Sequence, residues 1–143
     1  MDIDLISKEI VNAISNYSEA VTNATKRGID ETAQEAKRIV EEKAPKGRKK
    51  RQYEKKNKMV SRRSGKYKKS IQIKSAYEDR YNKREYVCVK PNEHALAHLL
   101  ENGHAMRQGG RFKGNPHFVY GEKYILENME KNIIKELNSI DTT

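Results

Sequence analysis

The sequence is poor in the residues that build a large core or a covalent framework. Its 143 residues include one cysteine, two phenylalanines and no tryptophan, and the mean hydropathy is -1.03. The single Cys88 excludes an internal disulfide, and its apolar setting from Tyr86 to Val89 predicts a small buried residue on a strand. No apolar run approaches the ~20 residues that span a bilayer. The acidic start, Met1 to Asp4, lacks the features of a signal peptide. We therefore expect a chain made in a reducing cytoplasm, with no membrane partner.

Positive charge, in contrast, is abundant and unevenly spread. The net charge is +10, but residues 46–70 contain thirteen Lys or Arg and one Glu, a local charge of 13 − 1 = +12. The other residues therefore carry 10 − 12 = −2. So dense a cationic segment attracts polyanions or acidic protein surfaces. The candidate contact residues are Arg48, Lys49, Lys50, Arg51, Lys55, Lys56, Lys58, Arg62 and Arg63. Non-specific contact with nucleic acid and docking on an acidic protein neighbour both remain open, since no motif for sequence-specific recognition is present.

The first 45 residues have the pattern of one long helix. Apolar or small residues recur in steps of mostly three and four, which places them in one stripe that faces a core or a partner. The stripe comprises Ile3, Ile6, Ile10, Ile14, Tyr17, Val21, Ala24, Gly28, Ala33, Ala36 and Val40. Gly28 weakens a helix interior, so we expect a bend or break near Arg27–Asp30, and Pro45 ends the helix. Its length suggests packing along other subunits as well as along its own sheet.

The rest of the chain predicts a small sheet and further helices. Residues 46–63 show no periodicity and indicate a long exposed loop or hairpin arm. Strands are expected over 70–76 and 84–90, a short helix over 93–102, a glycine-rich loop over 104–117 and a closing helix over 118–137. We therefore predict one α+β domain over 1–143, with the long N-terminal helix and the C-terminal helix packed on a small antiparallel sheet.

No constellation predicts catalysis, and we expect neither an enzyme nor a cofactor. His94 and His98 share a helical face and are weak metal candidates, but the order Glu-His-Ala-Leu-Ala-His lacks the general base of His-Glu-x-x-His. Ordinary surface or interface histidines are the favoured interpretation. Cys88 lies in an apolar setting that disfavours the thiolate. A nuclease needs convergent carboxylates, and Glu78 and Asp79 have no obvious partner.

Several blocks of sequence, in order, resemble a known family. Ala97-His98-Leu99-Leu100-Glu101-Asn102-Gly103-His104 is followed by Arg107-Gln108-Gly109-Gly110-Arg111 and then Asn115-Pro116-His117, and upstream stand Ala44-Pro45 and Ser64-Gly65-Lys66-Tyr67-Lys68-Lys69-Ser70-Ile71. This order resembles the tail-completion, or head–tail joining, family of long-tailed double-stranded DNA phages. Asn102 replaces the family's usual aromatic residue, Tyr67 replaces a commoner Leu, and the basic insert is unusually long.

The resemblance implies a structural protein of the virion neck, assembled in the host bacterial cytoplasm. It implies a homo-oligomeric ring, hexameric or matched to a twelvefold connector. The implied partners are a head connector or stopper protein, a tail terminator or tail-tube protein, and packaged DNA. The residues expected to hold turns or contribute to assembly are Glu101, Gly103, His104, Gly109, Gly110, Pro116 and His117. Among them, Gly103 is expected to adopt a positive φ, and Pro116 to set the start of the last helix.

Overall fold

The structure, a computed structural model, describes residues 3–46, 51–55, 58–62 and 65–140; for 51–55 and 58–62 it describes the backbone. The chain runs through α1 (Ile3–Lys43), β1 (Arg51–Lys55), β2 (Lys58–Arg62), α2 (Lys66–Ser70), β3 (Ile71–Glu78), β4 (Lys83–Val89), the 3-10 turn η1 (Pro91–Glu93), α3 (His94–Asn102), β5 (His104–Ala105), β6 (Arg111–Phe112) and α4 (Phe118–Asn138). The strands pair in sequence order as two-stranded antiparallel sheets. The predicted α+β class is confirmed.

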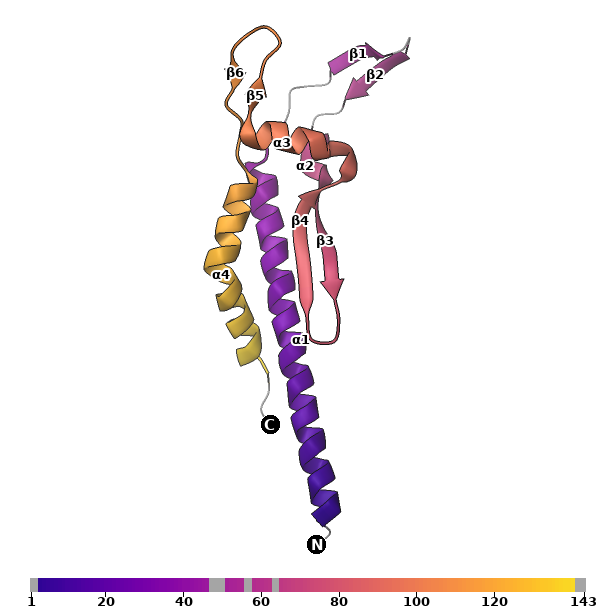
Figure 1. The fold of residues 1–143 in the computed structure, drawn as a ribbon, viewed down its shortest axis with the longest axis vertical. Coiled ribbons are helices and arrows are strands. Elements are labelled where there is room, and N and C mark those ends of the chain that lie inside the picture. Colours follow the sequence, from indigo (N-terminus) through magenta and orange to yellow (C-terminus); the bar gives the residue numbers. More distant parts are fainter. Residues whose placement is uncertain (1–2, 47–50, 56–57, 63–64, 141–143) are drawn as a thin grey trace.

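Helix α1 is the central element of the fold. It lies between α4 on one side and the β3–β4 hairpin on the other, and α4 runs antiparallel to it (Figure 1). The helix ends at Lys43, and the carbonyl of Val40 accepts the last helical bond, from the Ala44 amide, at 2.9 Å. The predicted end before Pro45 is therefore confirmed. A compact apolar cluster of Val40, Ala44, Tyr67, Ile71 and Val89 closes the end of α1 near α3.

The expected break near Arg27–Asp30 is wrong, because α1 continues through Gly28 without interruption. Gly28 is buried where α4 comes closest: a Cβ there would lie 2.8 Å from Ile133 Cα. Gly121 on α4 plays the reciprocal role, since its Cβ would lie 2.6 Å from Val40 Cγ2. The two missing side chains let the helix backbones approach each other closely. Gly28 is therefore a packing residue and not a hinge.

A bulge in the β3–β4 hairpin determines which side chains meet α1. Ile71 pairs with Val89 and Ile73 with Val87, but the register shifts by one residue between Ser75 and Tyr77. Because strand side chains alternate between faces, the extra residue turns Tyr77 outward and Glu78 toward α1. Cys88 pairs with Gln72 on the outward face and is half-buried. The prediction of a buried Cys88 is therefore wrong, because its neighbours Val87 and Val89 occupy the inner face.

Two segments predicted as irregular contain regular structure. Residues 51–55 and 58–62 pair as the hairpin β1–β2, which agrees with the hairpin alternative for the basic segment. Residues 104–117 contain the short pair β5–β6. The helical turn α2, Lys66–Ser70, was not predicted, because five residues with three lysines carry no usable periodicity. Both hairpins lie at the α3 end of the molecule, opposite the N-terminus of α1 (Figure 1).

Candidate functional site

His117 is the centre of a buried polar joint between distant parts of the chain. Its side chain is fully buried, and the Tyr67 hydroxyl lies 2.6 Å from its Nε2. On the other side of the ring, Nδ1 lies 2.8 Å from the Asn115 carbonyl oxygen and 3.1 Å from Glu101 Oε2. A neutral imidazole with its proton on Nδ1 fits both sides, because Nδ1 then donates and Nε2 accepts from Tyr67. The joint therefore ties α2 to the start of α4.

Glu101 caps α4 from outside that helix. Its Oε2 accepts hydrogen bonds from the amides of His117 at 2.9 Å and Phe118 at 3.3 Å. A carboxylate at this position satisfies free N–H groups and complements the positive end of the helix dipole. Pro116 lies outside α4, which begins at Phe118. Pro116 precedes the first residue of α4 by two positions, so its role in setting the helix start stays a prediction, whereas Glu101, sixteen residues before His117, caps the free amides.

Gly103 and Gly114 bring the two sides of the glycine-rich segment into close contact. The positive φ expected for Gly103 is confirmed at +76°, and a Cβ there would lie 2.2 Å from the Phe112 carbonyl oxygen. Gly114 has φ +87°, and its Cβ would lie 2.7 Å from the Gly103 amide nitrogen. The Asn115 amide then donates to the Leu100 carbonyl at 2.6 Å. Sequence reasoning missed Gly114. Its close contact with Gly103, where the two sides of the segment meet, is called the crossing.

Gly109 and Gly110 form the tip of the β5–β6 hairpin. Both have positive φ, at +90° and +84°. The Met106 amide donates to the Gly110 carbonyl, and the Gly109 amide to the Met106 carbonyl, both at 3.1 Å. His104 begins the hairpin, with its ring 5.4 Å from that of Phe112. The tip is therefore a tight turn that projects from the joint; its role in assembly stays a prediction.

The Tyr67 hydroxyl stays protonated across the ordinary pH range. Burial, with the nearby carboxylates of Glu101 and Glu93, raises the pKa of Tyr67 to about 12. Because the folded-state pKa lies above the unfolded value of about 10, this group's contribution to stability is complete below pH ~10 and lost as the pH rises through ~12. The hydroxyl therefore keeps, at neutral pH, the proton that it can donate to His117 Nε2.

Replacing Tyr67 with phenylalanine is expected to lower the free energy of unfolding by ~1–3 kcal/mol, because it leaves His117 Nε2 buried without a donor. Urea denaturation measures the change. Tyr77→Phe is the matched control: that hydroxyl donates to Asp79 at 2.6 Å, but on the exposed face. Equal, small losses in the two variants would contradict the structural role of the joint.

His94 and His98 lie together on the exposed face of α3, with ring centroids 4.8 Å apart. Among the residues that the structure describes, no group of three or more His, Cys, Asp or Glu side chains converges as a metal site would require. Among the described residues, His94 and His98 therefore have each other as possible metal ligands but no third one beside them.

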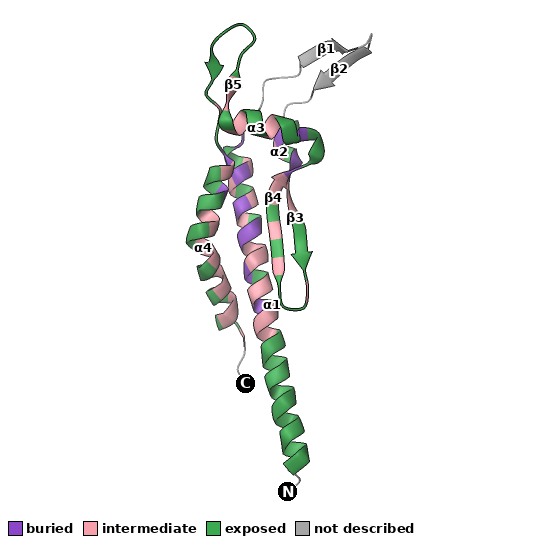
Figure 2. Cartoon of the chain, viewed as in Figure 1, coloured by how far each residue is buried: buried purple, intermediate pink, exposed green. Residues whose placement is uncertain are grey.

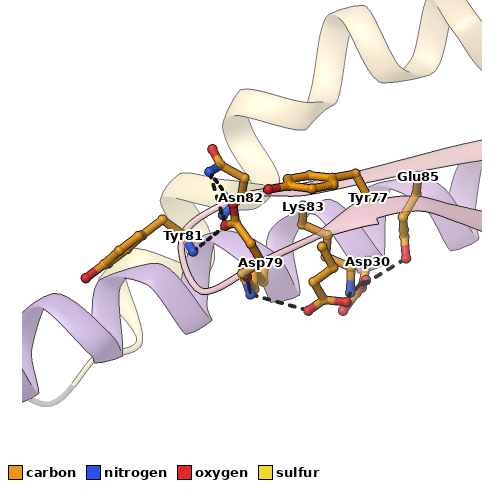
Figure 3. A network of polar contacts seen from close by, with 9 residues as sticks. Asp30, Tyr77, Asp79, Tyr81, Asn82, Lys83 and Glu85 are labelled. Carbon is orange, nitrogen blue, oxygen red and sulfur yellow. Dashed lines mark hydrogen bonds and ion pairs between the residues drawn. The ribbon is translucent and has the colours of Figure 1, made fainter.

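The acidic residues of the β3–β4 turn are engaged with α1 (Figure 3). Lys83 of β4 forms an ion pair with Asp30 of α1 and lies 3.6 Å from Glu85. A second ion pair joins Lys26 of α1 to Glu78 of β3 at 3.3 Å. The pKa of the Glu85 carboxyl is raised, mainly by burial and secondly by its hydrogen bond with Asp30. The hydrogen bond to Asp30 also raises the pKa of Lys83. These charges anchor the hairpin to α1, which gives Glu78 a structural partner.

Asp79 organises the tip of the same hairpin. Its carboxylate accepts hydrogen bonds from the Tyr77 hydroxyl at 2.6 Å and from the amides of Tyr81 and Asn82 at 2.8 and 2.6 Å. These bonds, that from Tyr77 above all, hold the pKa of Asp79 well below its usual range. The Asp79 carbonyl also accepts a bond from Lys26. The tip therefore ends beside residue 26 of α1.

The basic segment is described in part. Arg51, Lys55, Lys58 and Arg62 lie on β1 and β2, whereas Arg48, Lys49, Lys50, Lys56 and Arg63 lie outside the described residues. The register places Arg51 opposite Arg62 and Lys55 opposite Lys58.

The N-terminal part of α1 extends beyond the rest of the fold. Residues 3–19 are all exposed, and they include Ile3, Leu5, Ile6, Ile10, Val11, Ile14 and Tyr17 (Figure 2). A contiguous row of large apolar side chains on a monomer surface marks an interaction site. The same periodic stripe is buried further along, at Ala24, Gly28, Ala36 and Val40. This exposed part of α1, residues 3–19, is called the extension below.

Comparison with known proteins identifies the family. The sequence profile of the family described as "Bacteriophage HK97-gp10, putative tail-component" matches residues 8–103, which is most of the chain and covers α1 from Lys8 onward, both long strands and α3. The match ends at Gly103, so the β5–β6 hairpin and α4 lie beyond it. No curated protein and no solved structure matches the chain. Within the described residues, no helix is both long and apolar enough to cross a membrane. The chain belongs to the HK97-gp10-like family of phage tail components.

Proposed function

We propose that the chain is a ring subunit of the phage neck that joins the head connector, or a stopper protein on it, to the tail terminator or tail tube. The subunit acts structurally, without catalysis, and its place is the virion neck. The ring is a hexamer or matches a twelvefold connector. The family of phage tail components supports the tail context.

The observation that carries the proposal is the extension. Seventeen successive residues of α1 (19 − 3 + 1) are exposed, with no layer from the described part of the chain over them, although they carry seven large apolar side chains. A helix so exposed gains little in a free monomer, because helix stability in proteins comes mainly from packing. Contacts with other subunits stabilise it. At the other end of the molecule the two hairpins project (Figure 1), so the subunit presents binding elements at both ends.

Removing the chain from the phage tests the proposal. We expect DNA-filled heads and finished tails to accumulate unattached, as seen by electron microscopy of the lysate. Adding the purified chain to that lysate should restore infectious particles. Normal virions in the absence of the chain, or tails that fail to form at all, would exclude a joining role.

Nucleic-acid contact through the basic arm is a second candidate function, favoured by the local charge of +12 over residues 46–70. Each cation placed near a phosphate releases counterions, so such binding weakens steeply with salt. Replacing Arg48, Lys49, Lys50 and Arg51 with glutamine is expected to abolish salt-sensitive DNA binding in a filter-binding assay. If binding is unchanged while head–tail joining fails, the arm docks on an acidic protein surface instead.

A further inference from the structure

The apolar stripe on the extension is a continuation of the face that α4 covers. Ile3, Ile6, Ile10, Ile14 and Tyr17 follow one another at steps of three or four, and Val21, Ala24 and Gly28 prolong the same row. Gly28 lies under Ile133 of α4. The exposed and the covered residues therefore form one surface, of which α4 occupies only part. Ile3 is 78% exposed and Ile14 is 64% exposed, whereas Ala24 is fully buried.

Both layers that cover α1 stop at nearly the same level. Two ion pairs join the last turns of α4 to α1: Lys135 lies 2.7 Å from Glu31, and Glu136 lies 2.9 Å from Arg27. Helix α4 then ends at Asn138. The β3–β4 turn reaches Lys26. From Glu19 to Ile3 no other described residue covers the helix, and this exposed part is roughly 25 Å long at 1.5 Å per residue. That length can accommodate a second helical segment of the same size.

We propose that the extension binds the extension of a second copy of this chain, antiparallel and centred on Ile10. The stripe has steps of three, four, four and three, so it is symmetric about Ile10. An antiparallel pair therefore places Ile10 against Ile10, Ile6 against Ile14 and Ile3 against Tyr17. Such an isologous contact buries the same residues on both copies.

The position of α4 selects the antiparallel direction. A parallel partner helix that followed the stripe would run into α4, which already covers the face from Ala24 to Val40. An antiparallel partner begins near Tyr17, just below the end of α4, and runs in the direction of α4. Its own globular part then lies beyond Ile3, away from every described residue of the first copy. The partner helix thus continues the layer that α4 begins.

Charge and area agree with a second copy. The charged residues of the extension are Asp4, Lys8, Glu9 and Glu19. Pairing about Ile10 brings Asp4 to the level of Asn16 along the axis, Lys8 to that of Asn12 and Glu9 to that of Val11, so no two like charges of the extension share a level. Five stripe residues with about 100 Å² each to bury give roughly 500 Å² per copy. The total of about 1,000 Å² reaches the lower bound for a specific interface.

This pair goes beyond the proposed function, because it concerns the free chain. In a cyclic ring every subunit points the same way, whereas an isologous pair points both ways. The pair is therefore the form of the chain before assembly, and it opens when subunits enter a ring. It keeps the stripe covered until then.

Cysteine cross-linking of the purified full-length chain, in a Cys88→Ser background, tests the pairing. Ile10→Cys alone is expected to form covalent dimers on mild oxidation. Ile3→Cys and Tyr17→Cys are expected to cross-link poorly alone but efficiently when the two variants are mixed. Leu5→Cys, exposed on the opposite side of the helix, is the control and should stay monomeric. Self-cross-linking of Ile3→Cys as strong as in the mixture would establish a parallel pair and overturn the proposal.

The mass in solution provides a second readout. Light scattering should give twice the chain mass of 16.6 kDa for the unmodified chain and the single chain mass for Ile10→Asp. Circular dichroism should show that Ile10→Asp remains folded, because Ile10 is exposed in the single chain. A monomeric unmodified chain overturns the pairing but leaves the proposed neck function standing, since the phage lacking the chain tests that function separately.

Discussion

Replacing Gly103 with valine is expected to destabilise the chain by about 3 kcal/mol or more and to block head–tail joining. The backbone at Gly103 has φ +76° and ψ 175°, a region that costs a side chain of order 1–3 kcal/mol. In addition, a Cβ at this position would lie 2.2 Å from the Phe112 carbonyl oxygen and 2.8 Å from the Lys113 carbonyl carbon. These are backbone atoms, so no side-chain rotation relieves the clash. The β5–β6 segment must move away from α3.

Urea denaturation and phage complementation measure the two parts of this prediction. In complementation, heads and tails should still form but remain separate. Gly109→Val is the control, because Gly109 also has a positive φ, of +90°, but no atom lies within 4 Å of its Cβ position. It therefore shows the cost of backbone strain alone. Normal infectious particles from the Gly103→Val phage, or equal stability losses for the two variants, would contradict the role given to this crossing.

The second large effect is expected at Gly28, where alanine should destabilise the chain by about 1–3 kcal/mol. In an exposed helix interior, alanine in place of glycine stabilises by ~1 kcal/mol, so the sign of the change is diagnostic. The added Cβ would lie 2.8 Å from both Cα and Cγ1 of Ile133, which forces α4 away from α1. Thermal or urea unfolding gives the sign.

A double-mutant cycle with Ile133→Ala identifies the cause. Removing Cγ1 of Ile133 relieves part of the clash, so this second substitution should cost less in the Gly28→Ala chain than in the unmodified chain. If Gly28→Ala stabilises the protein, Gly28 is a weak point of the helix and the close contact with α4 does not limit packing.

Features local in the sequence could be predicted. The steps of three and four along α1, with Pro45 after it, predicted a helix that the structure ends at Lys43. Alternation predicted the strands, and Gly103 was recognised as a helix terminator. Each of these signals depends on neighbours within a few residues, where chain geometry alone decides the structure.

Features that depend on contacts between residues far apart in the sequence could not be predicted from it. Tyr67 and His117 are 50 residues apart, and Glu101 is 16 residues from the amide that it caps. No local pattern pairs them. Gly28 predicted a bend or break because sequence alone does not distinguish a glycine that weakens a helix from one that admits another backbone. The bulge before Tyr77, where the β3–β4 register shifts after Ser75, likewise has no local signal in the sequence.

The periodicity of the sequence also could not distinguish the exposed part of the α1 stripe from the buried part. Ile10 and Ala24 occupy equivalent places in the pattern, yet Ala24 is fully buried and Ile10 is 55% exposed. The difference arises because α4 is 21 residues long and α1 is 41. The unequal lengths leave the part of this apolar face on residues 3–19 exposed.

Cryo-electron microscopy of the neck of the intact virion tests the central claim most directly. We predict a ring at the head–tail joint whose subunits each show a long helix paired with a shorter antiparallel helix over about half its length. Absence of the chain from the virion, or its density only along the tail tube or at the tail tip, would contradict the proposed joining function.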